Sequence, residues 1–259
     1  MSRPVAFRPN WAGRLAWLLL AAYVAYAAGI LDVSWERIVR GIPAGRHFLA
    51  RMFPPAWDGP RLELLTAGLL ESLQIAVLAT VFGVLLSLPL GLLAARNLVP
   101  GWVAWPARAL IALCRSFHPV IVAILFVKAV GFGALAGVLA LVVASMGFIS
   151  KLFAEAIEEM SMKQMEAVRA TGAGFTNVLL MGVLPQVMAR FIGFGAYQLD
   201  SNLRNSTMVG IVGGGGIGAA LFTAYQRFDF DFVLTILLAI IAIIMVGEVL
   251  TVQLRRVFQ

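Results

Sequence analysis

The chain has 259 residues, of which 61% are hydrophobic and 13% are charged, and its mean hydropathy is +0.92. A soluble domain carries about 25% charged residues, so this composition excludes a soluble globular protein and predicts a membrane protein. The net charge of +7 does not indicate nucleic-acid binding, because basic residues at the ends of spans set topology and contact anionic lipid. The single cysteine, Cys114, excludes a disulfide framework within the chain.

Apolar runs long enough to cross a membrane as helices predict an all-α, polytopic membrane protein with about six spans. The runs lie at residues 15–31, 69–95, 105–130, 134–149, 186–202 and 232–254. The first has two interpretations, because Ala25-Tyr26-Ala27 resembles a signal-peptide cleavage site. Its length favours a retained span, so we expect residues 1–259 to form a single transmembrane domain. A kink is expected in the second span at Pro89.

Two segments between the spans are hydrophilic. In residues 32–68, Trp35 and Trp57 lie among charged residues, which favours interfacial helices on the outer face of the membrane. Basic residues are mildly enriched in the segments that this topology places inside the cell. We therefore expect residues 160–185, and both termini, to be cytoplasmic.

The cytoplasmic loop at residues 160–185 has the sequence of a bent helical hairpin. Residues 166–170 favour a helix, and Gly172 suits the left-handed conformation that ends one. Thr176 is expected to cap a second short helix, and Pro185 suits the first turn of the following span. Small residues in the first helix let another surface approach closely, so we expect this loop to dock into a pocket on a different protein.

The third span, residues 105–130, contains Arg115 and the pair His118-Pro119. Proline removes a backbone donor and pushes the preceding residue out of helical geometry, so we expect the helix to break there. An arginine inside a span faces the bundle interior or water, and a broken helix beside a guanidinium can handle an anion. The alternative is that Arg115 lies near enough to the cytoplasmic end to extend its charge into water.

We expect an anion path between the third and fifth spans. Its candidate residues carry guanidinium, hydroxyl, imidazole and amide groups: Arg115, Ser116, His118, Asn202, Asn205 and Ser206. The polar groups of the fifth span have a second interpretation, as a helix end at the interface. Asp200 and Arg204 are expected to pair on one helix face, since they are four residues apart. Arg190 and Glu248 each lie just inside a cytoplasmic span end and are expected to form a structural ion pair.

The glycine-rich segment contains Gly213-x-Gly215-x-x-Gly218, which fits a dinucleotide-binding pattern, but no strand–helix–strand context surrounds it. Consecutive glycines cannot form a stable span, so this backbone is either buried in protein or lines a cavity. Two interpretations stay open: a tight turn that lets helices approach, and a flexible element beside the path. The sequence has no phosphate-loop, catalytic-triad or metal-ligand pattern, so an enzyme is disfavoured and no cofactor is expected in this chain.

The loop resembles the EAA loop of ABC-importer permeases at five positions: Glu166, Ala167, Gly172, Leu184 and Pro185. Val168 replaces the second alanine of that motif and Gly182 replaces its isoleucine. Further stretches, among them residues 89–97, 151–158 and 201–218, resemble the phosphonate-type permeases. This chain departs from that pattern at Gly214, where alanine is usual, and at Asn205, where serine is commoner.

The resemblance implies a type I importer permease of the bacterial plasma membrane. Two six-span copies would surround a central path, dock a cytoplasmic ABC ATPase dimer that uses ATP and Mg, and receive solute from an external binding protein. The family handles phosphonates and the reduced oxyanions phosphite and hypophosphite. The alternatives are a membrane-complex scaffold subunit and an ion-coupled secondary transporter. The second is disfavoured because it needs more embedded acids than Glu248.

Overall fold

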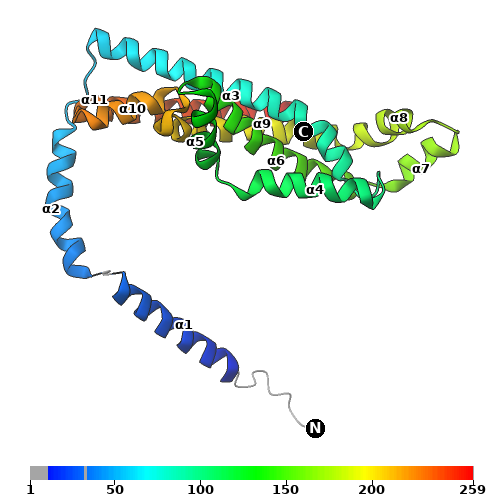
Figure 1. Ribbon diagram of the computed structural model, residues 1–259, viewed down its shortest axis with the longest axis horizontal. Helices are drawn as coiled ribbons and strands as arrows, with labels where there is room; N and C mark the ends of the chain where they lie inside the picture. Colours follow the sequence, from blue (N-terminus) through cyan, green and yellow to red (C-terminus); the bar gives the residue numbers. More distant parts are fainter. Residues whose placement is uncertain (1–10, 32–33, 259) are drawn as a thin grey trace. The chain divides into compact units, whose positions relative to one another are not determined.

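The computed structural model describes residues 11–31 and 34–258. It divides into two compact units, Met1–Phe53 and Pro54–Gln259, whose helices are drawn in Figure 1. The expected all-α class is confirmed, since helices account for nearly all of the described residues. Five of the helices are long and apolar enough to cross a membrane, or six if one bent pair counts as a span.

The first unit contains α1, Trp11–Ile30, and α2, Trp35–Arg51. Helix α1 is long and apolar enough to span a membrane, and within its own unit none of its residues is buried. Ser34 caps α2, because its Oγ accepts a hydrogen bond from the backbone N–H of Arg37 (3.3 Å). The predicted helix within residues 32–68 is therefore present, and its interfacial location stays a prediction.

Helix α3, Gly59–Ala94, has 36 residues and begins ahead of the predicted span start at residue 69. At 1.5 Å per residue it is about 54 Å long, well beyond the roughly 30 Å hydrocarbon core of a bilayer. Residues 59–68 are therefore the first turns of this helix. The helix also continues through Pro89 without a break.

The third predicted span is broken where the sequence indicated. Helices α4, Gly101–Ser116, and α5, Pro119–Val130, are bent by 91° relative to each other. Pro119 occupies the first turn of α5, and His118 is extended, with φ −67° and ψ 141°. His118 also caps α5, since its Nδ1 accepts a hydrogen bond from the backbone N–H of Val120 (3.3 Å).

Helix α6, Ala134–Glu158, is the central helix of the second unit and contacts α3, α4, α5 and α9, Leu184–Val209. Small residues bring it close to its neighbours. A Cβ added at Gly91 of α3 would lie 2.7 Å from Phe153 Cδ1, and one added at Gly147 would lie 2.8 Å from Cys114 Cβ of α4. Close contact between helices at glycine is typical of bundles packed in lipid, where dispersion contacts drive association.

The segment before α9 consists of α7, Met162–Ala170, α8, Phe175–Asn177, and the π-helical turn η1, Val178–Val183. Pro185 lies in the first turn of α9, as predicted. The predicted cap at Thr176 is wrong, because the backbone N–H of Val178 already donates to Gly174 O (3.1 Å) and Gly174 caps α8. The predicted fifth span also extends further, to Val209.

After α9, the π-helical turn η2, Gly210–Gly214, leads into α10, Ile217–Gln226, and then α11, Phe230–Phe258. In the second unit, Figure 1 shows α10 and the start of α11 at one end of the bundle and α7 with α8 at the other. The two ends are therefore separated by the length of α3.

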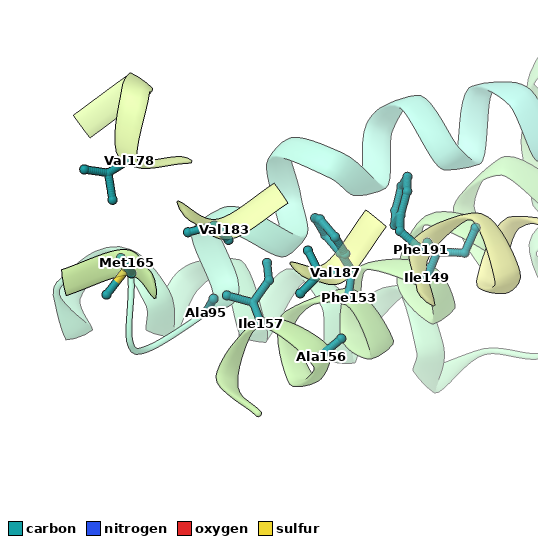
Figure 2. Close-up of a cluster of buried hydrophobic side chains, with 10 residues drawn as sticks. All are labelled: Ala95, Ile149, Phe153, Ala156, Ile157, Met165, Val178, Val183, Val187 and Phe191. Atoms are coloured by element: carbon teal, nitrogen blue, oxygen red, sulfur yellow. The ribbon is translucent and has the colours of Figure 1, made fainter. Parts of the chain in front are cut away.

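A cluster of buried apolar side chains lies at the α7 end (Figure 2). It joins the ends of α3 and α6 to α7, η1 and the start of α9. Its members are Ala95, Ile149, Phe153, Ala156, Ile157, Met165, Val178, Val183, Val187 and Phe191. Because one cluster includes residues of all these segments, the loop at residues 160–185 packs on the helical bundle.

Candidate coupling loop and translocation path

Helix α7 has one buried residue and an exposed face. Met165 is fully buried, whereas the neighbouring Glu166 and Ala167 are exposed. Gly172 follows the helix with φ +79°, so the predicted left-handed position is confirmed. The helix is thus fixed by Met165 beneath and by a sharp turn after it, while its carboxylate and small residues remain available to another protein.

The π-helical turn η1 packs tightly against α7 because of Gly182. A Cβ added at Gly182 would lie 3.2 Å from Met165 Cα, which is closer than most real Cβ contacts. Gln186 strengthens this junction, since its Nε2 donates to Ser161 O (3.3 Å) and Gly182 O (2.5 Å). Gly182 therefore suits the close packing seen here, which the isoleucine of the EAA motif would push apart.

The loop also exposes large apolar side chains. Phe175, the first residue of the short α8, is 56% exposed, and Met181, in η1, is 72% exposed. Exposed apolar groups beside a carboxylate and small residues are typical of protein interaction sites rather than of a solvated turn. The geometry of residues 160–185 therefore fits a docking element.

Polar contacts tie the bundle end together behind this loop. Glu158 Oε1 lies 2.6 Å from Arg108 Nη2 and accepts a hydrogen bond from the backbone N–H of Arg96 (2.7 Å). Arg108 Nε donates to Ala94 O (2.8 Å), and Asn97 Nδ2 donates to Ile157 O (2.8 Å). The ends of α3 and α6 and the middle of α4 are thus joined, so a force applied to α7 acts on a connected unit.

Arg190 is not paired as the sequence predicted. Its Nη1 lies 3.1 Å from Glu159 Oε2, and both side chains are more than half exposed. Glu248 is exposed on α11. The expected Arg190–Glu248 pair is replaced by Arg190–Glu159, because the first turns of α9 lie beside the C-terminal end of α6. An exposed pair of this kind contributes little to stability.

Arg115 lies at the bend between α4 and α5, and its charge is directed toward the α7 end. A Cβ added at Gly147 would lie 2.9 Å from Arg115 Cγ. The side chain lines a cavity of about 150 Å³ together with Arg108, Lys151 and Glu155. Lys151 and Glu155 follow Gly147 along α6, so this geometry favours the alternative in which Arg115 extends its charge along the helix.

The other candidates at this bend are exposed. The hydroxyl of Ser116 donates to Ala112 O (2.8 Å), one turn earlier in its own helix. His118 is exposed as well, and its Nδ1 is engaged at the start of α5. Among the described residues, no hydrogen bond or ion pair joins either side chain to α9.

Asn202 lies at the centre of a buried hydrogen-bond network between α3, α6 and α9. Its Nδ2 donates to Thr80 Oγ1 (2.9 Å) and Ser145 Oγ (2.9 Å). Gln198 Nε2 donates to Ser145 Oγ (3.0 Å) and to Asn202 Oδ1 (3.0 Å). All four side chains are buried, and Asn202 and Ser145 are fully so. In this state of the protein, Asn202 therefore joins helices.

The structure does not bring the predicted path residues together. Asn202 contacts Ser145, whereas Arg115 packs on Gly147, and residues two apart on a helix are about 200° apart around its axis. Ser206 is buried, with its hydroxyl donating to Leu203 O (2.8 Å). Asn205 is half-buried, and its Nδ2 donates to Ser201 Oγ (3.3 Å). Of the three candidates on α9, Asn205 is the one whose side chain is partly exposed at the surface.

Thr80, Ser145 and Gln198 of this network were not predicted from the sequence. The signal was present, because Thr80 and Ser145 are isolated polar residues within apolar runs and Gln198 begins the polar part of the fifth span, and such residues in lipid form interhelical hydrogen bonds. Which of them meet depends on the rotation of each helix about its axis, which their spacing along the chain does not give.

The family model described as binding-protein-dependent transport system inner membrane component matches residues 87–259, which is more than half of the chain. The chain belongs to this family. It is therefore a transport permease and a multi-pass membrane protein.

Relatives identify the chain as a phosphonate-type permease of the ABC importers, and a solved structure shares its fold. The phosphate-import permease protein PhnE of Mycolicibacterium smegmatis is 42% identical over 206 residues, covering 79% of this chain and 38% of that protein. The phosphite transport system permease protein PtxC of Stutzerimonas stutzeri is 38% identical over 232 residues, covering 89% of this chain and 83% of that protein. A chain of an inward-facing MetNI methionine ABC transporter matches the fold with a TM-score of 0.68 at 23% identity, over 78% of the permease and 100% of that chain.

The glycine-rich segment of the permease is a tight, largely buried turn. Gly213, Gly215 and Gly216 have φ of +101°, +81° and +74°, which side chains rarely adopt. The backbone N–H of Ile217 donates to Ser72 Oγ (2.9 Å) of α3. A Cβ added at Gly214 would lie 2.9 Å from Val209 O, so the alanine that is usual here in the family requires a shift of the turn. These contacts favour the first of the two interpretations, a turn that lets helices approach.

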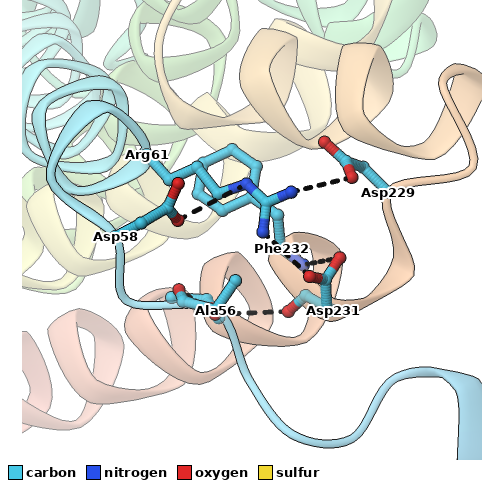
Figure 3. Close-up of polar contacts among 7 residues, drawn as sticks. Ala56, Asp58, Arg61, Asp229, Asp231 and Phe232 are labelled. Carbon is cyan, nitrogen blue, oxygen red and sulfur yellow. Dashed lines mark hydrogen bonds and ion pairs between the residues drawn. The ribbon is translucent and has the colours of Figure 1, made fainter.

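At the end opposite α7, the permease has an ionic cluster around Arg61 (Figure 3). Its guanidinium lies 2.8 Å from Asp231 Oδ2, 3.0 Å from Asp229 Oδ1 and 3.5 Å from Asp58 Oδ1. The guanidinium carbon also lies 5.8 Å from the centroid of the Phe232 ring, within the range of a cation–π contact. The cluster fixes the start of α3 to the turn between α10 and α11.

Proposed function

We propose that the permease is the transmembrane subunit of an ATP-driven importer for phosphonates or the reduced oxyanions phosphite and hypophosphite, in the bacterial inner membrane. The observation that supports the import mechanism is the coupling loop: α7 is held by Met165 in the core and exposes Glu166 and Ala167. The names of its relatives, one a phosphate-import and one a phosphite permease, support the substrate class.

In this proposal, the partners follow from the exposed surfaces and from the membrane. The loop at residues 160–185 docks one subunit of a cytoplasmic ABC ATPase dimer, which binds and uses ATP and Mg, and the permease itself holds no cofactor. A second copy of the chain completes the path, lipid covers the outer helices, and a solute-binding protein docks at the external end, near Arg61. Nucleic acid is not a partner.

Reconstitution of the complex in proteoliposomes tests this proposal. The permease, its ATPase and its binding protein are placed in proteoliposomes, and the binding protein is loaded in turn with phosphite, hypophosphite, methylphosphonate or phosphate. We expect ATP hydrolysis to rise about tenfold with a transported ligand, since only loaded binding protein promotes the closed state that hydrolyses ATP. Proteoliposomes without the permease are the control.

Uptake of the same ligands is measured with and without ATP. The proposal predicts uptake that requires ATP and binding protein together. Uptake driven by an ion gradient in the absence of ATP would instead support a secondary transporter. If phosphate stimulates hydrolysis and none of the other three does, the import mechanism stands and the proposed substrate class is overturned.

A further inference from the structure

One ion pair of α9 lies deep in the membrane-spanning part of the permease. Arg204 Nη2 is 2.6 Å from Asp200 Oδ2, so the predicted pair is confirmed. Asn202, between them in sequence, bonds to Ser145, which lies near the middle of α6, Ala134–Glu158. The pair is therefore near the level of the middle of α6, and Arg204 lies five residues before the end of α9 at Val209.

The two members of this pair differ in exposure. The Asp200 side chain is 10% exposed, whereas the Arg204 side chain is 42% exposed on the surface of the unit. A charge facing lipid at this depth is costly, and embedded arginines face the bundle interior or water. The face of α9 that carries Arg204 must therefore border protein or an aqueous path when the permease is in a membrane.

The residues around Arg204 favour an aqueous path over a dry interface. Tyr197, Ser201, Arg204 and Asn205 lie at spacings of four, three and one, so they share one face of α9. We call these four residues the α9 stripe. Tyr197 is 43% exposed, and Ser201 and Asn205 are half-buried, with Asn205 Nδ2 donating to Ser201 Oγ (3.3 Å). A dry interface in lipid is typically made of small residues, and Ser201 is the one small residue of this stripe.

We propose that the α9 stripe lines the translocation path and that Arg204 is the cationic residue contacted by the transported oxyanion, with Asp200 positioning its guanidinium. The identity of the anion rests on the proposed function. Asp200 occupies one terminal nitrogen of a guanidinium that has five N–H donors, so the others can meet oxygens of a tetrahedral anion.

Burial of the Asp200 carboxylate costs free energy, and its role in positioning Arg204 explains why the residue is there. Its Oδ1 is buried and has no hydrogen-bond partner among the described residues. A buried acceptor without a donor is destabilising. Asp200 also compensates part of the arginine charge, which keeps binding of the anion weak enough for release into the next segment of the path. An aspartate that only filled space would not need both an ion pair with Arg204 and a buried oxygen without a partner.

Cysteine accessibility tests the first half of the proposal. The single native cysteine is removed as Cys114→Ser, and Ser201→Cys, Asn205→Cys and Ile192→Cys are made separately in the full complex. Ile192 is 38% exposed on the same helix, about 120° around its axis from Arg204. Charged methanethiosulfonates should label positions 201 and 205 about tenfold faster than 192, because the reactive thiolate forms only in contact with water.

Protection by phosphite tests the second half of the proposal, the contact between Arg204 and the transported anion. Phosphite uptake is measured in parallel. We expect phosphite to slow labelling at position 201, and Arg204→Gln to abolish this protection and to lower phosphite uptake by about tenfold or more. Arg204→Lys should retain part of both, since it keeps the charge but loses the planar donor pattern. The matched control is Arg40→Gln on α2, which removes an arginine that is likewise paired with a carboxylate one turn earlier, Glu36.

The outcomes are distinguishable from failure of the proposed function. Slow labelling at 201 and 205 in every nucleotide state would overturn the path, whatever the substrate. Labelling without protection, or normal uptake by Arg204→Gln, would overturn the role of Arg204. Absence of ATP-driven uptake by the unaltered complex would instead overturn the proposed function, while labelling of the stripe would still support its contact with water.

Discussion

Replacing Gly172 with valine is expected to abolish ATP-driven uptake while the permease still reaches the membrane. Gly172 has φ +79°, and a β-branched residue is a genuine outlier in that conformation. The left-handed conformation costs an ordinary residue about 1–2 kcal/mol, so the turn after α7 should open and Glu166 should lose its fixed orientation toward the proposed ATPase. ATP hydrolysis and phosphite uptake are measured on the same proteoliposomes, and hydrolysis should lose its dependence on loaded binding protein.

The chain offers a matched control two residues further on. Gly174 has φ −66°, which any residue adopts, and a Cβ at either glycine meets nothing within 4 Å. Gly174→Val therefore adds the same side chain to open space without backbone strain, and it should retain most of the uptake. If both variants transport normally at equal abundance, the bend after α7 is not needed for coupling.

Replacing Asn202 with leucine should lower the thermal stability of the permease more than any other single change to the buried network. The change leaves Thr80, Ser145 and Gln198 without their shared partner. Each of the hydrogen bonds lost contributes about 0.5–1.5 kcal/mol, so the melting temperature of the variant should lie well below that of the unaltered protein. The melting temperature in detergent, followed by intrinsic fluorescence, measures the effect.

A pair of isosteric changes controls for side-chain shape. Thr80→Val removes a buried hydroxyl that accepts from Asn202, whereas Thr223→Val removes an exposed hydroxyl that bonds to Ala219 O within its own helix. We expect Thr80→Val to lower the melting temperature and Thr223→Val to leave it nearly unchanged. Equal effects of the two would contradict a stabilising role for the network.

Much of the helical arrangement was predictable because helix ends have local causes. Pro119 and the extended residue before it break the third span, Gly172 ends α7 and Pro185 begins α9, each as the sequence indicated. The cap of α8 was misplaced by two residues, since Gly174 can start a helix through its carbonyl without a side-chain cap. Each of these helix ends depends on the backbone preference of one residue, so it can be predicted from the sequence.

The side-chain groupings were less predictable because they depend on how each helix is rotated. Arg115 and Asn202 are both polar residues within spans, yet they meet α6 at residues about 200° apart around its axis. Arg190 pairs with Glu159 instead of Glu248 because α9 begins beside the end of α6. By contrast, the pairing of Asp200 with Arg204 lies within one helix, where a spacing of four is sufficient.

Photo-crosslinking from α7 tests most directly whether this loop is the coupling element of an ABC importer. A photoreactive amino acid replaces Ala167 in the assembled complex of permease, ATPase and binding protein, and a second variant carries it at Trp57, which is 58% exposed near the Arg61 end. The account predicts a covalent product with the ATPase from position 167, greatly reduced by Gly172→Val, and none from position 57. A product with the ATPase from position 57 and none from position 167 would contradict it.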